Sequence, residues 1–296
     1  MKKFIIILFL AILSAGTTMA KGLSAHRGEV ENGYNFWLYD PNDVEIDDPK
    51  PVVIFLHGSS LCGNDLNRVK RYGTIDAIER GREIDAYVIA PQNPGGAWSP
   101  LRVMNVLDWV SDNYNIDYDR VYVIGMSLGG YGTIDVTATY PDRIAAAIAM
   151  CGGGSVKDLS GLNDVPLWII HGTADSAVTI AQSDKVVEAM KASAGSNGTK
   201  RLIYNRIPGM NHSRPARMFY LNESYEWLFK HTLKDAKRVV HPSFSVEDAM
   251  GGAYSDLKSS GKSSGKSSIK AKSSKKKSSR KTAQTKTKKK TGKRRG

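Results

Sequence analysis

The 296-residue sequence predicts an α/β protein built on a mainly parallel sheet with helices on both faces. Short apolar runs alternate along the chain with longer segments that place apolar residues at helical spacing, as in repeated strand–helix units. The run PVVIFL at residues 51–56 is apolar throughout, which is typical of a strand buried on both faces. The alternation of strands with helices and the doubly buried strand together predict a parallel sheet between two layers of helices.

The first half of the chain supplies three strands and two helices. Residues 34–39 predict the first strand, and residues 64–80 predict a helix between the apolar strands 51–56 and 86–90. Ser99 and Pro100 predict the start of a second helix, because serine is a favoured N-cap and proline is tolerated in the first turn. Apolar residues then continue at helical spacing: Leu101, Met104, Leu107 and Val110.

The second half repeats the pattern. A strand at residues 120–124 precedes a helix at 128–140, which Pro141 ends because proline cannot continue a helix. Gly195 closes another helix, since glycine is common just after a helix C-terminus. The remaining predicted elements are strands at 145–150, 166–170 and 200–207, and helices at 179–194 and 219–233.

Charge and composition divide the chain into three segments: a signal peptide at 1–20, a folded domain at 21–245 and a disordered Lys/Ser-rich basic tail at 246–296. Two lysines followed by FIIILFLAIL and small residues describe a secretory signal, with a retained anchor as the alternative. The last 39 residues contain 17 Lys and Arg and no Asp or Glu. The other 25 basic residues face 29 acidic ones, so the excess positive charge belongs to the tail.

Two cysteines, Cys62 and Cys151, are too few for a disulfide framework. Export permits them to pair, but we expect two buried thiols. No Cys/His spacing suggests a zinc site, and we expect no metal and no cofactor.

The segment VIGMSLGGYG at residues 123–132 places Ser127 between Gly125 and Gly129 where a strand ends and a helix begins. A sharp strand-to-helix turn crowds the backbone, and flanking glycines relieve that crowding. A serine on such a turn is held out beyond the carboxyl end of the sheet, where ligands of α/β sheets bind. Ser127 is therefore the candidate nucleophile.

A serine nucleophile needs a base and an acid that orients the base. In this topology the three follow in the order Ser, Asp or Glu, His. His212, in the loop after the last predicted strand, and Asp175, just after the strand 166–170, occupy the required positions. We expect His57 and His171, which lie at strand ends before a glycine, to have structural roles.

The oxyanion of an acyl-transfer intermediate needs two N–H donors. We predict one from the backbone of Leu128, the residue after Ser127, and one from Ser59, in the loop after residues 51–56. Ser60 is the next candidate, and an ordinary turn at Ser59 and Ser60 is the alternative.

Five segments, LHGSS, IAPQNPGGAW, DYDRVYVIGMSLGGYGTIDVTATYPDRIAAAIAMCGGG, PLWIIHGTAD and PGMNHS, together resemble a known family. They are similar to single-domain esterases and predicted peptidases of the α/β-hydrolase superfamily, in the phospholipase/carboxylesterase-like branch related to feruloyl and polyhydroxybutyrate esterases. The likeness covers roughly residues 30–232. It implies an α/β-hydrolase fold in which Ser127 is the nucleophile, His212 the base and Asp175 the orienting acid, with Ser59 and Leu128 forming the oxyanion hole.

Only residues 155–165 separate Gly154 from the next predicted strand, so we expect no large cap over the site. An uncapped site suits a bulky or polymer-borne ester, and Trp98 is expected either to form one of its walls or to pack in the core. The sequence therefore predicts an exported, periplasmic or extracellular, serine hydrolase of carboxylic esters. The alternatives are a peptidase with the same triad and a non-catalytic hydrolase-like binding protein. The basic tail is expected to bind an anionic polymer electrostatically, or to act only as a solvated solubility segment.

Overall fold

The computed structural model describes residues 22–41, 48–194, 199–235 and 237–259. The chain divides into two units, Met1–Ser259 and Ser260–Gly296, and all described residues belong to the first. The predicted signal peptide and residues 260–296 of the predicted tail lie outside the described residues. Among the residues that are described, no helix has the length and apolar character needed to cross a membrane.

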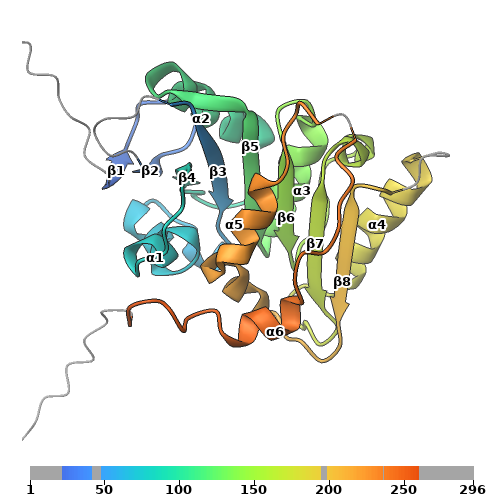
Figure 1. Ribbon diagram of the computed structural model, residues 1–296. Helices are drawn as coiled ribbons and strands as arrows, with labels where there is room; N and C mark the ends of the chain where they lie inside the picture. The colour runs from blue at the N-terminus through green and yellow to red at the C-terminus, as the bar shows by residue number, and fades with distance from the viewer. Residues whose placement is uncertain (1–21, 42–47, 195–198, 236, 260–296) are drawn as a thin grey trace, which may run out of the picture. The chain divides into compact units, whose positions relative to one another are not determined.

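A single sheet organises the described domain (Figure 1). Its strand order is β1-β2-β4-β3-β5-β6-β7-β8. The pairs β1–β2 and β2–β4 are antiparallel, and every later pair is parallel. The strands are β1 (Gly22–His26), β2 (Phe36–Asp40), β3 (Lys50–Leu56), β4 (Tyr87–Pro91), β5 (Ile116–Met126), β6 (Ala146–Met150), β7 (Leu167–Gly172) and β8 (Leu202–Ile207).

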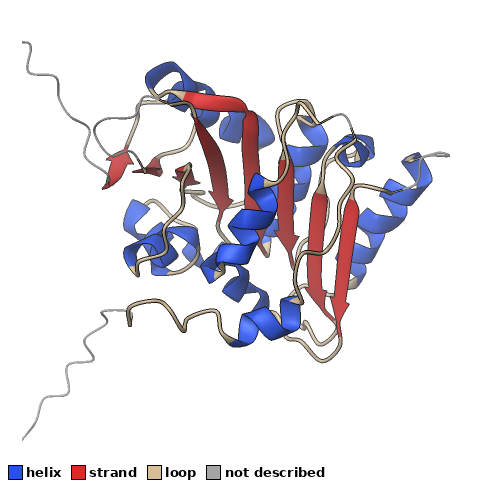
Figure 2. Ribbon diagram, viewed as in Figure 1, coloured by secondary structure: helices blue, strands red, loops and turns tan. Residues whose placement is uncertain are grey.

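Helices cover both faces of this sheet (Figure 2). One face packs against η2 (Leu66–Arg71), α1 (Thr74–Glu79), η5 (Arg214–Tyr220), α5 (Asn222–Phe229) and α6 (Val246–Gly251). The other face packs against α2 (Pro100–Asn113), α3 (Leu128–Thr139), η3 (Ser160–Asp164) and α4 (Ala181–Ser193). The predicted fold class, a mainly parallel sheet between two helical layers, is confirmed.

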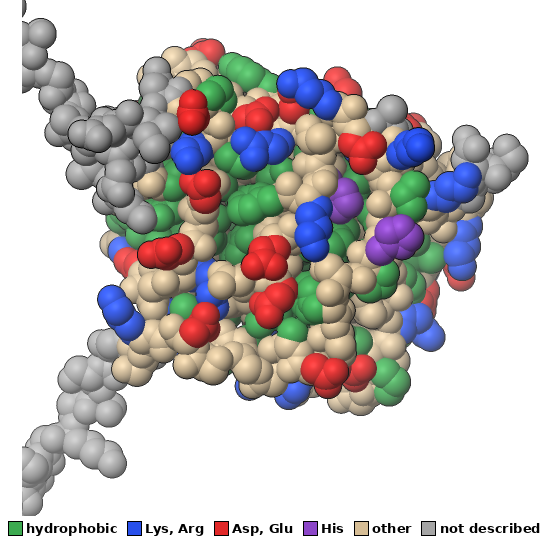
Figure 3. Space-filling model, viewed as in Figure 1, with side chains coloured by type: hydrophobic (Ala, Val, Ile, Leu, Met, Phe, Trp, Pro, Cys, Tyr) green, Lys and Arg blue, Asp and Glu red, His purple; other side chains and the backbone are tan. Residues whose placement is uncertain are grey.

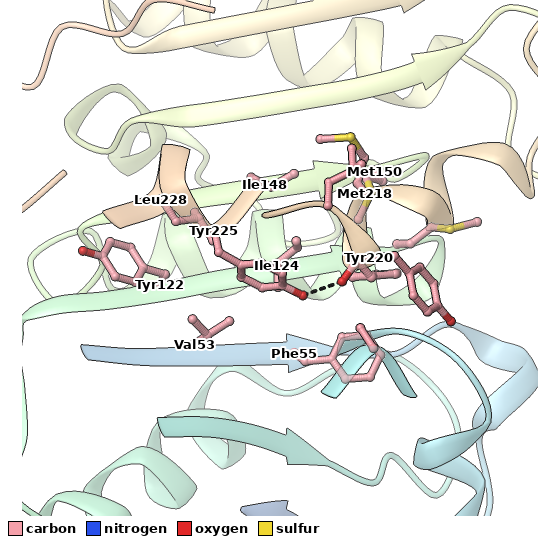
Figure 4. Packing of buried hydrophobic residues seen from close by; sticks show 14 of the residues in the cluster. Val53, Phe55, Tyr122, Ile124, Ile148, Met150, Met218, Tyr220, Tyr225 and Leu228 are labelled. Atoms are coloured by element: carbon pink, nitrogen blue, oxygen red, sulfur yellow. Dashed lines mark hydrogen bonds between the residues drawn. The ribbon is translucent and has the colours of Figure 1, made fainter. Parts of the chain in front are cut away.

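The unbroken apolar run in β3 is explained by burial on both faces. Val53 and Phe55 point into the cluster with α1 and α5, and Figure 4 shows them in the same cluster as Tyr225 and Leu228 of α5. Alternate β3 residues point into the opposite cluster with α2 and α3. Every residue of this strand from position 51 onward is therefore buried, and the pattern carries no polar alternation.

Two predicted helices are each divided in the structure. The segment 64–80 forms η2 and α1, which are separated at Gly73. Gly73 has φ +95°, and a Cβ there would overlap the ring of Phe55. The segment 219–233 forms the end of η5 and then α5, because Leu221 between them is extended, with φ −89° and ψ 132°. Strand β1 has no counterpart among the predicted elements.

The predicted domain boundary at residue 245 is wrong. Helix α6 follows it, and Val246, Met250 and Ala253 are buried in the core. Farther along, Asp256 accepts two hydrogen bonds from the guanidinium of Arg82, at 2.8 and 2.9 Å. The apolar residues at 246, 250 and 253 follow helical spacing, and this signal extends the folded domain into the segment assigned to the tail.

The connection between β6 and β7, residues 151–166, contains only the short helix η3. The carboxyl ends of β5, β7 and β8 lie along one edge of the sheet, since these strands run parallel in the order β5-β6-β7-β8. The loops that follow these three strands carry Ser127, Asp175 and His212.

Candidate active site

Ser127 occupies a strained turn between β5 and α3, with φ 59° and ψ −122°. A positive φ is costly for a residue with a side chain and persists only where the surroundings enforce it. The flanking glycines make the turn possible, because a Cβ on Gly125 would overlap Gly129 and a Cβ on Gly129 would overlap the carbonyl oxygen of Leu56. The Ser127 N–H donates to Met150 O at 2.8 Å, which ties the turn to β6.

Asp175 and His212 form a direct pair. The Nδ1 atom of His212 lies 2.7 Å from Oδ2 of Asp175, whose side chain is fully buried while the imidazole is 26% exposed. The other carboxylate oxygen, Oδ1, accepts the backbone N–H groups of Ala177 and Val178, both at 2.9 Å. Burial by itself raises the pKa of Asp175, but the hydrogen bonds from His212 and the Val178 N–H hold that pKa below its usual range.

Ser127 and His212 line the same cavity, which has a volume of about 480 Å³. Tyr72, Val178 and Ser59 are among its other walls, and none of the residues that line it is Asp, Glu, Lys or Arg. No described hydrogen bond joins Ser127 Oγ to the His212 ring. Such bonds are often long before substrate binds, so shared access to the cavity is the relevant observation.

The predicted oxyanion donors, Ser59 and Leu128, each begin a helix: Ser59 opens η1 (Ser59–Leu61) and Leu128 opens α3. The N–H of a first helical residue has no intrahelical acceptor. His57 fixes the turn before Ser59, since its Nδ1 donates to Gly58 O at 2.8 Å and its Nε2 accepts the Asn93 N–H at 3.0 Å. In a trans peptide the N–H points away from the carbonyl, so the hold on Gly58 O also orients the Ser59 N–H.

These contacts confirm the structural role expected for His57. Burial lowers the pKa of His57 to about 4, so the ring is neutral at physiological pH. A neutral ring is also what its two contacts require, with one nitrogen donating and the other accepting.

Trp98 does not line the cavity. Its side chain is 3% exposed, and its Nε1 donates to His57 O at 3.3 Å. The indole packs edge-on against Tyr34 and His57, with ring centroids 5.2 and 5.0 Å apart. The expectation of a substrate contact is corrected to the alternative of core packing, because the indole turns inward beneath the turn that precedes Ser59.

No sequence pattern pointed to Tyr72 as a residue of the site. Its hydroxyl accepts the Gly58 N–H at 3.2 Å, lies 3.3 Å from Ser60 Oγ and borders the cavity. Tyr72 follows η2 in an irregular segment, so no periodicity or motif identifies it. Only the folded chain brings it to the turn that carries Ser59.

Both cysteines are free thiols: Cys151 is buried and Cys62 is half-buried. Burial and the nearby Asp175 raise the pKa of Cys151, so it remains a neutral thiol. Within the described part of the chain, Cys151, His171 and Asp175 form a group whose potential ligand atoms lie within 4.8 Å of one another. The polar atoms of His171 and Asp175 already have protein partners, so this group has no donor set left for a metal.

A mainly parallel sheet between two helical layers, with a serine on a strained turn after β5, defines the α/β-hydrolase fold. The chain has this fold, and its sequence is similar to those of α/β-hydrolases. No family model matches it.

Its relatives are esterases and a depolymerase. The chain is 30% identical over 236 residues to poly(3-hydroxyalkanoate) depolymerase C of Paucimonas lemoignei, covering 56% of this chain and 55% of the relative. It is 24% identical over 195 residues to acetylxylan esterase A of Aspergillus ficuum, covering 60% of this chain and 62% of the relative. The crystal structure of a thermostable esterase aligns with a TM-score of 0.55 and 28% identity, over 67% of this chain and 59% of the other. The chain thus spans less than two thirds of the length of each.

Proposed function

We propose that this protein hydrolyses carboxylic esters through a Ser-His-Asp triad and an acyl-enzyme intermediate. The observation that carries the proposal is the pair formed by His212 and Asp175, 2.7 Å apart, whose imidazole borders the same cavity as Ser127 on its strained turn. The esterases among the relatives support the same reaction class.

The proposed reaction has two halves, acylation of Ser127 and hydrolysis of the acyl-enzyme, and the same residues act in both. Asp175 accepts the Nδ1–H of His212, which leaves the Nε2 lone pair to take the proton of Ser127 Oγ as that oxygen attacks the ester carbonyl. The backbone N–H groups of Ser59 and Leu128 stabilise the oxyanion that forms. The alcohol leaves with the proton from His212, and water then repeats the sequence on the acyl-enzyme to release the acid.

The lining of the cavity favours a neutral ester. Its lining residues include no Asp, Glu, Lys or Arg, while Met126, Val178 and Ala216 supply apolar surface. The connection between β6 and β7 contains only the short helix η3, so this connection forms no cap domain over the cavity. The names of two relatives refer to polymers, acetylxylan and poly(3-hydroxyalkanoate), and a polymer-borne ester is the substrate class we propose.

The decisive experiment compares Ser127→Ala with Ser60→Ala, a matched loss of a serine hydroxyl from the same cavity. On a short activated aryl ester, Ser127→Ala is expected to lower kcat by a factor on the order of 10⁶, and Ser60→Ala by less than about tenfold. An organophosphate should label Ser127 in the wild-type protein.

Two alternatives have distinct outcomes in the same assay. A peptidase with this triad turns over peptide amides faster than the matching esters. A non-catalytic binding protein shows no turnover of either substrate that depends on Ser127. Full activity in Ser127→Ala would refute the triad.

We further propose that the protein is exported and that its basic tail tethers it to an anionic polymer. Acidic and basic side chains are interspersed on the domain face in Figure 3, whereas residues 258–296 carry 17 Lys and Arg and no acid. A charge run of this kind binds polyanions through counterion release, so its affinity falls steeply with salt.

The tether is tested with a deletion of residues 260–296 and with a full-length variant that has Gln at every Lys and Arg of that segment. Both are expected to lose retention on an anionic polymer at low salt and to keep kcat/KM on a small ester. Retention that does not weaken with salt, or survival of retention in the Gln variant, would contradict the tether.

A further inference from the structure

His171 is a buried ionisable group that the proposed chemistry does not use. It lies near the end of β7, four residues before Asp175, and its side chain is fully buried. Both ring nitrogens have partners: Nδ1 lies 2.8 Å from Ser183 Oγ, and Nε2 lies 2.9 Å from Val178 O and 3.2 Å from Oδ2 of Asp175. The ring therefore links β7 to the acid that holds His212.

The partners of Nε2 decide where the His171 proton lies. A carbonyl oxygen only accepts, and the Asp175 carboxylate is ionised and already accepts from three other donors. A bare Nε2 would face two acceptors, so Nε2 carries a proton and donates it.

The state of Nδ1 depends on the Ser183 hydroxyl, which also lies 2.8 Å from Gly152 O. If that hydroxyl donates to Nδ1, His171 is neutral. If it donates to Gly152 O, Nδ1 carries a second proton and the ring is cationic. In both states the Nε2–H donates to Val178 O, and Oδ2 of Asp175 lies 3.2 Å from Nε2.

We propose that His171 is a positioning residue for the catalytic acid: its Nε2–H anchors Val178, whose own N–H holds Oδ1 of Asp175, and Nε2 lies 3.2 Å from Oδ2, the oxygen that accepts the Nδ1–H of His212. The proposal rests on the proposed function. Oδ2 of Asp175 accepts from His212 at 2.7 Å and lies 3.2 Å from Nε2 of His171, while Oδ1 is held by two backbone N–H groups. The carboxylate is fixed at both oxygens, and the imidazole that it orients is fixed with it.

The nearby ring has an electrostatic consequence. The positive end of the His171 N–H dipole beside Oδ2 offsets part of the carboxylate charge, so its removal strengthens the hold of Asp175 on the protonated form of the base. The acidic limb of the pH profile of kcat/KM then moves to higher pH.

Few other ionisable groups face this pair. Cys151 lies against Asp175 and remains a neutral thiol. Arg206 is the register partner of His171 on β8, but its guanidinium pairs with Asp184 of α4 at 3.0 Å. If substitution of His171 shifts the acidic limb of the pH profile of kcat/KM, the shift is therefore assigned to the loss of the His171 Nε2–H.

The test compares three variants of the full-length protein. His171→Leu removes the hydrogen bond to Val178 O and the N–H beside Asp175, and is expected to lower kcat about tenfold, the upper scale of one neutral hydrogen bond, with KM within about twofold. His171→Gln can return an amide donor toward Asp175 and is expected to recover part of that loss. Ser183→Ala removes the partner of Nδ1 but keeps the Nε2–H, so it should lower the melting temperature and leave the acidic limb in place.

A purely structural role predicts a different result, in which stability falls in all three variants and the acidic limb moves in none. An unmoved limb and unchanged kcat in a folded His171→Leu variant would overturn the proposal, as would an equal shift in Ser183→Ala. If His171→Leu does not fold, side-chain ¹⁵N spectra of the wild-type protein give the answer directly. A protonated His171 Nε2 from pH 5 to 9 is expected, and a bare Nε2 refutes the proposal.

Failure of the proposed function is distinguishable from failure of this inference. Absence of any hydrolysis that depends on Ser127 in the wild-type protein refutes the esterase proposal. Normal hydrolysis that is indifferent to His171 refutes only the positioning role.

Discussion

Asp175→Asn separates the charge of the acid from its shape. The two backbone N–H groups at Oδ1, from Ala177 and Val178, require an acceptor there, so the new amide places its oxygen at Oδ1 and its NH₂ at the Oδ2 position. That NH₂ then donates to Nδ1 of His212, 2.7 Å away in the wild-type protein. The proton of His212 moves to Nε2, and the ring no longer has a lone pair to accept the proton of Ser127.

The expected loss follows from the wrong tautomer. With substrate binding untouched, kcat should fall by a factor on the order of 10⁴ and KM should change little. The amide also faces the Nε2 of His171 with a donor in place of an acceptor, which should cost about 1–3 kcal/mol in the free energy of unfolding.

The assay is steady-state hydrolysis of a short aryl ester, with urea denaturation measured in parallel. Asp164→Asn is the matched control: its carboxylate is 68% exposed and lies 3.4 Å from Arg201. An exposed pair of this kind contributes about 0–1 kcal/mol, so activity and stability should be nearly unchanged. A folded Asp175→Asn variant that keeps more than about a tenth of kcat would refute the assignment of the acid. Equal losses in the two variants would also refute it.

Two further predictions test the surroundings of the nucleophile. Gly129→Ala places a Cβ against the carbonyl oxygen of Leu56, and the backbone cannot move away without strain. The free energy of unfolding, measured by urea denaturation, should therefore fall by about 3 kcal/mol or more. The control is Gly251→Ala, whose new Cβ would have nothing within 4 Å and should lower it by less than about 0.5 kcal/mol. Similar urea denaturation midpoints for Gly129→Ala and Gly251→Ala would rule out the tight contact between β3 and α3. His57, whose pKa is lowered to about 4, contributes stability above pH 6.5 that is lost as the pH falls toward 4, because the unfolded chain takes up the proton first. The expected loss in the free energy of unfolding between pH 6.5 and pH 4 is about 3 kcal/mol. A His57→Gln variant whose stability falls as steeply over this pH range as that of the wild-type protein would contradict this prediction.

Local sequence was sufficient where the determining interactions are local. The glycines around Ser127 predict the turn because they are needed within the same few residues, and the structure shows positive φ at Ser127 itself. The apolar run at 51–56 predicts a doubly buried strand because both faces of β3 are covered. Helix α2 begins at Pro100, where the Ser99 side chain accepts from the Arg102 N–H as its sequence position predicts.

Local sequence was insufficient where a distant segment decides the environment. Trp98 looks the same in sequence whether it faces a substrate or the core, and only its packing against Tyr34 and His57 settles which. The extra helix α6 depends on burial of Met250 against segments far away in sequence. Tyr72 reaches the Ser59 turn through contacts that no periodicity encodes.

The sequence by itself determined the alternation of strands and helices between β2 and α5, the turn at Ser127 and the candidacy of Asp175 and His212, because spacing along the chain carries that information. The tertiary structure decided which groups meet. Asp175 and His212 are 37 residues apart, and their 2.7 Å contact exists only because β7 and β8 are neighbours with their carboxyl ends at one edge of the sheet. The second histidine beside the same carboxylate oxygen, at 3.2 Å, was likewise set by the fold. A hydrogen bond requires its atoms to lie within about 3 Å of each other, and only long-range packing fixes positions that closely.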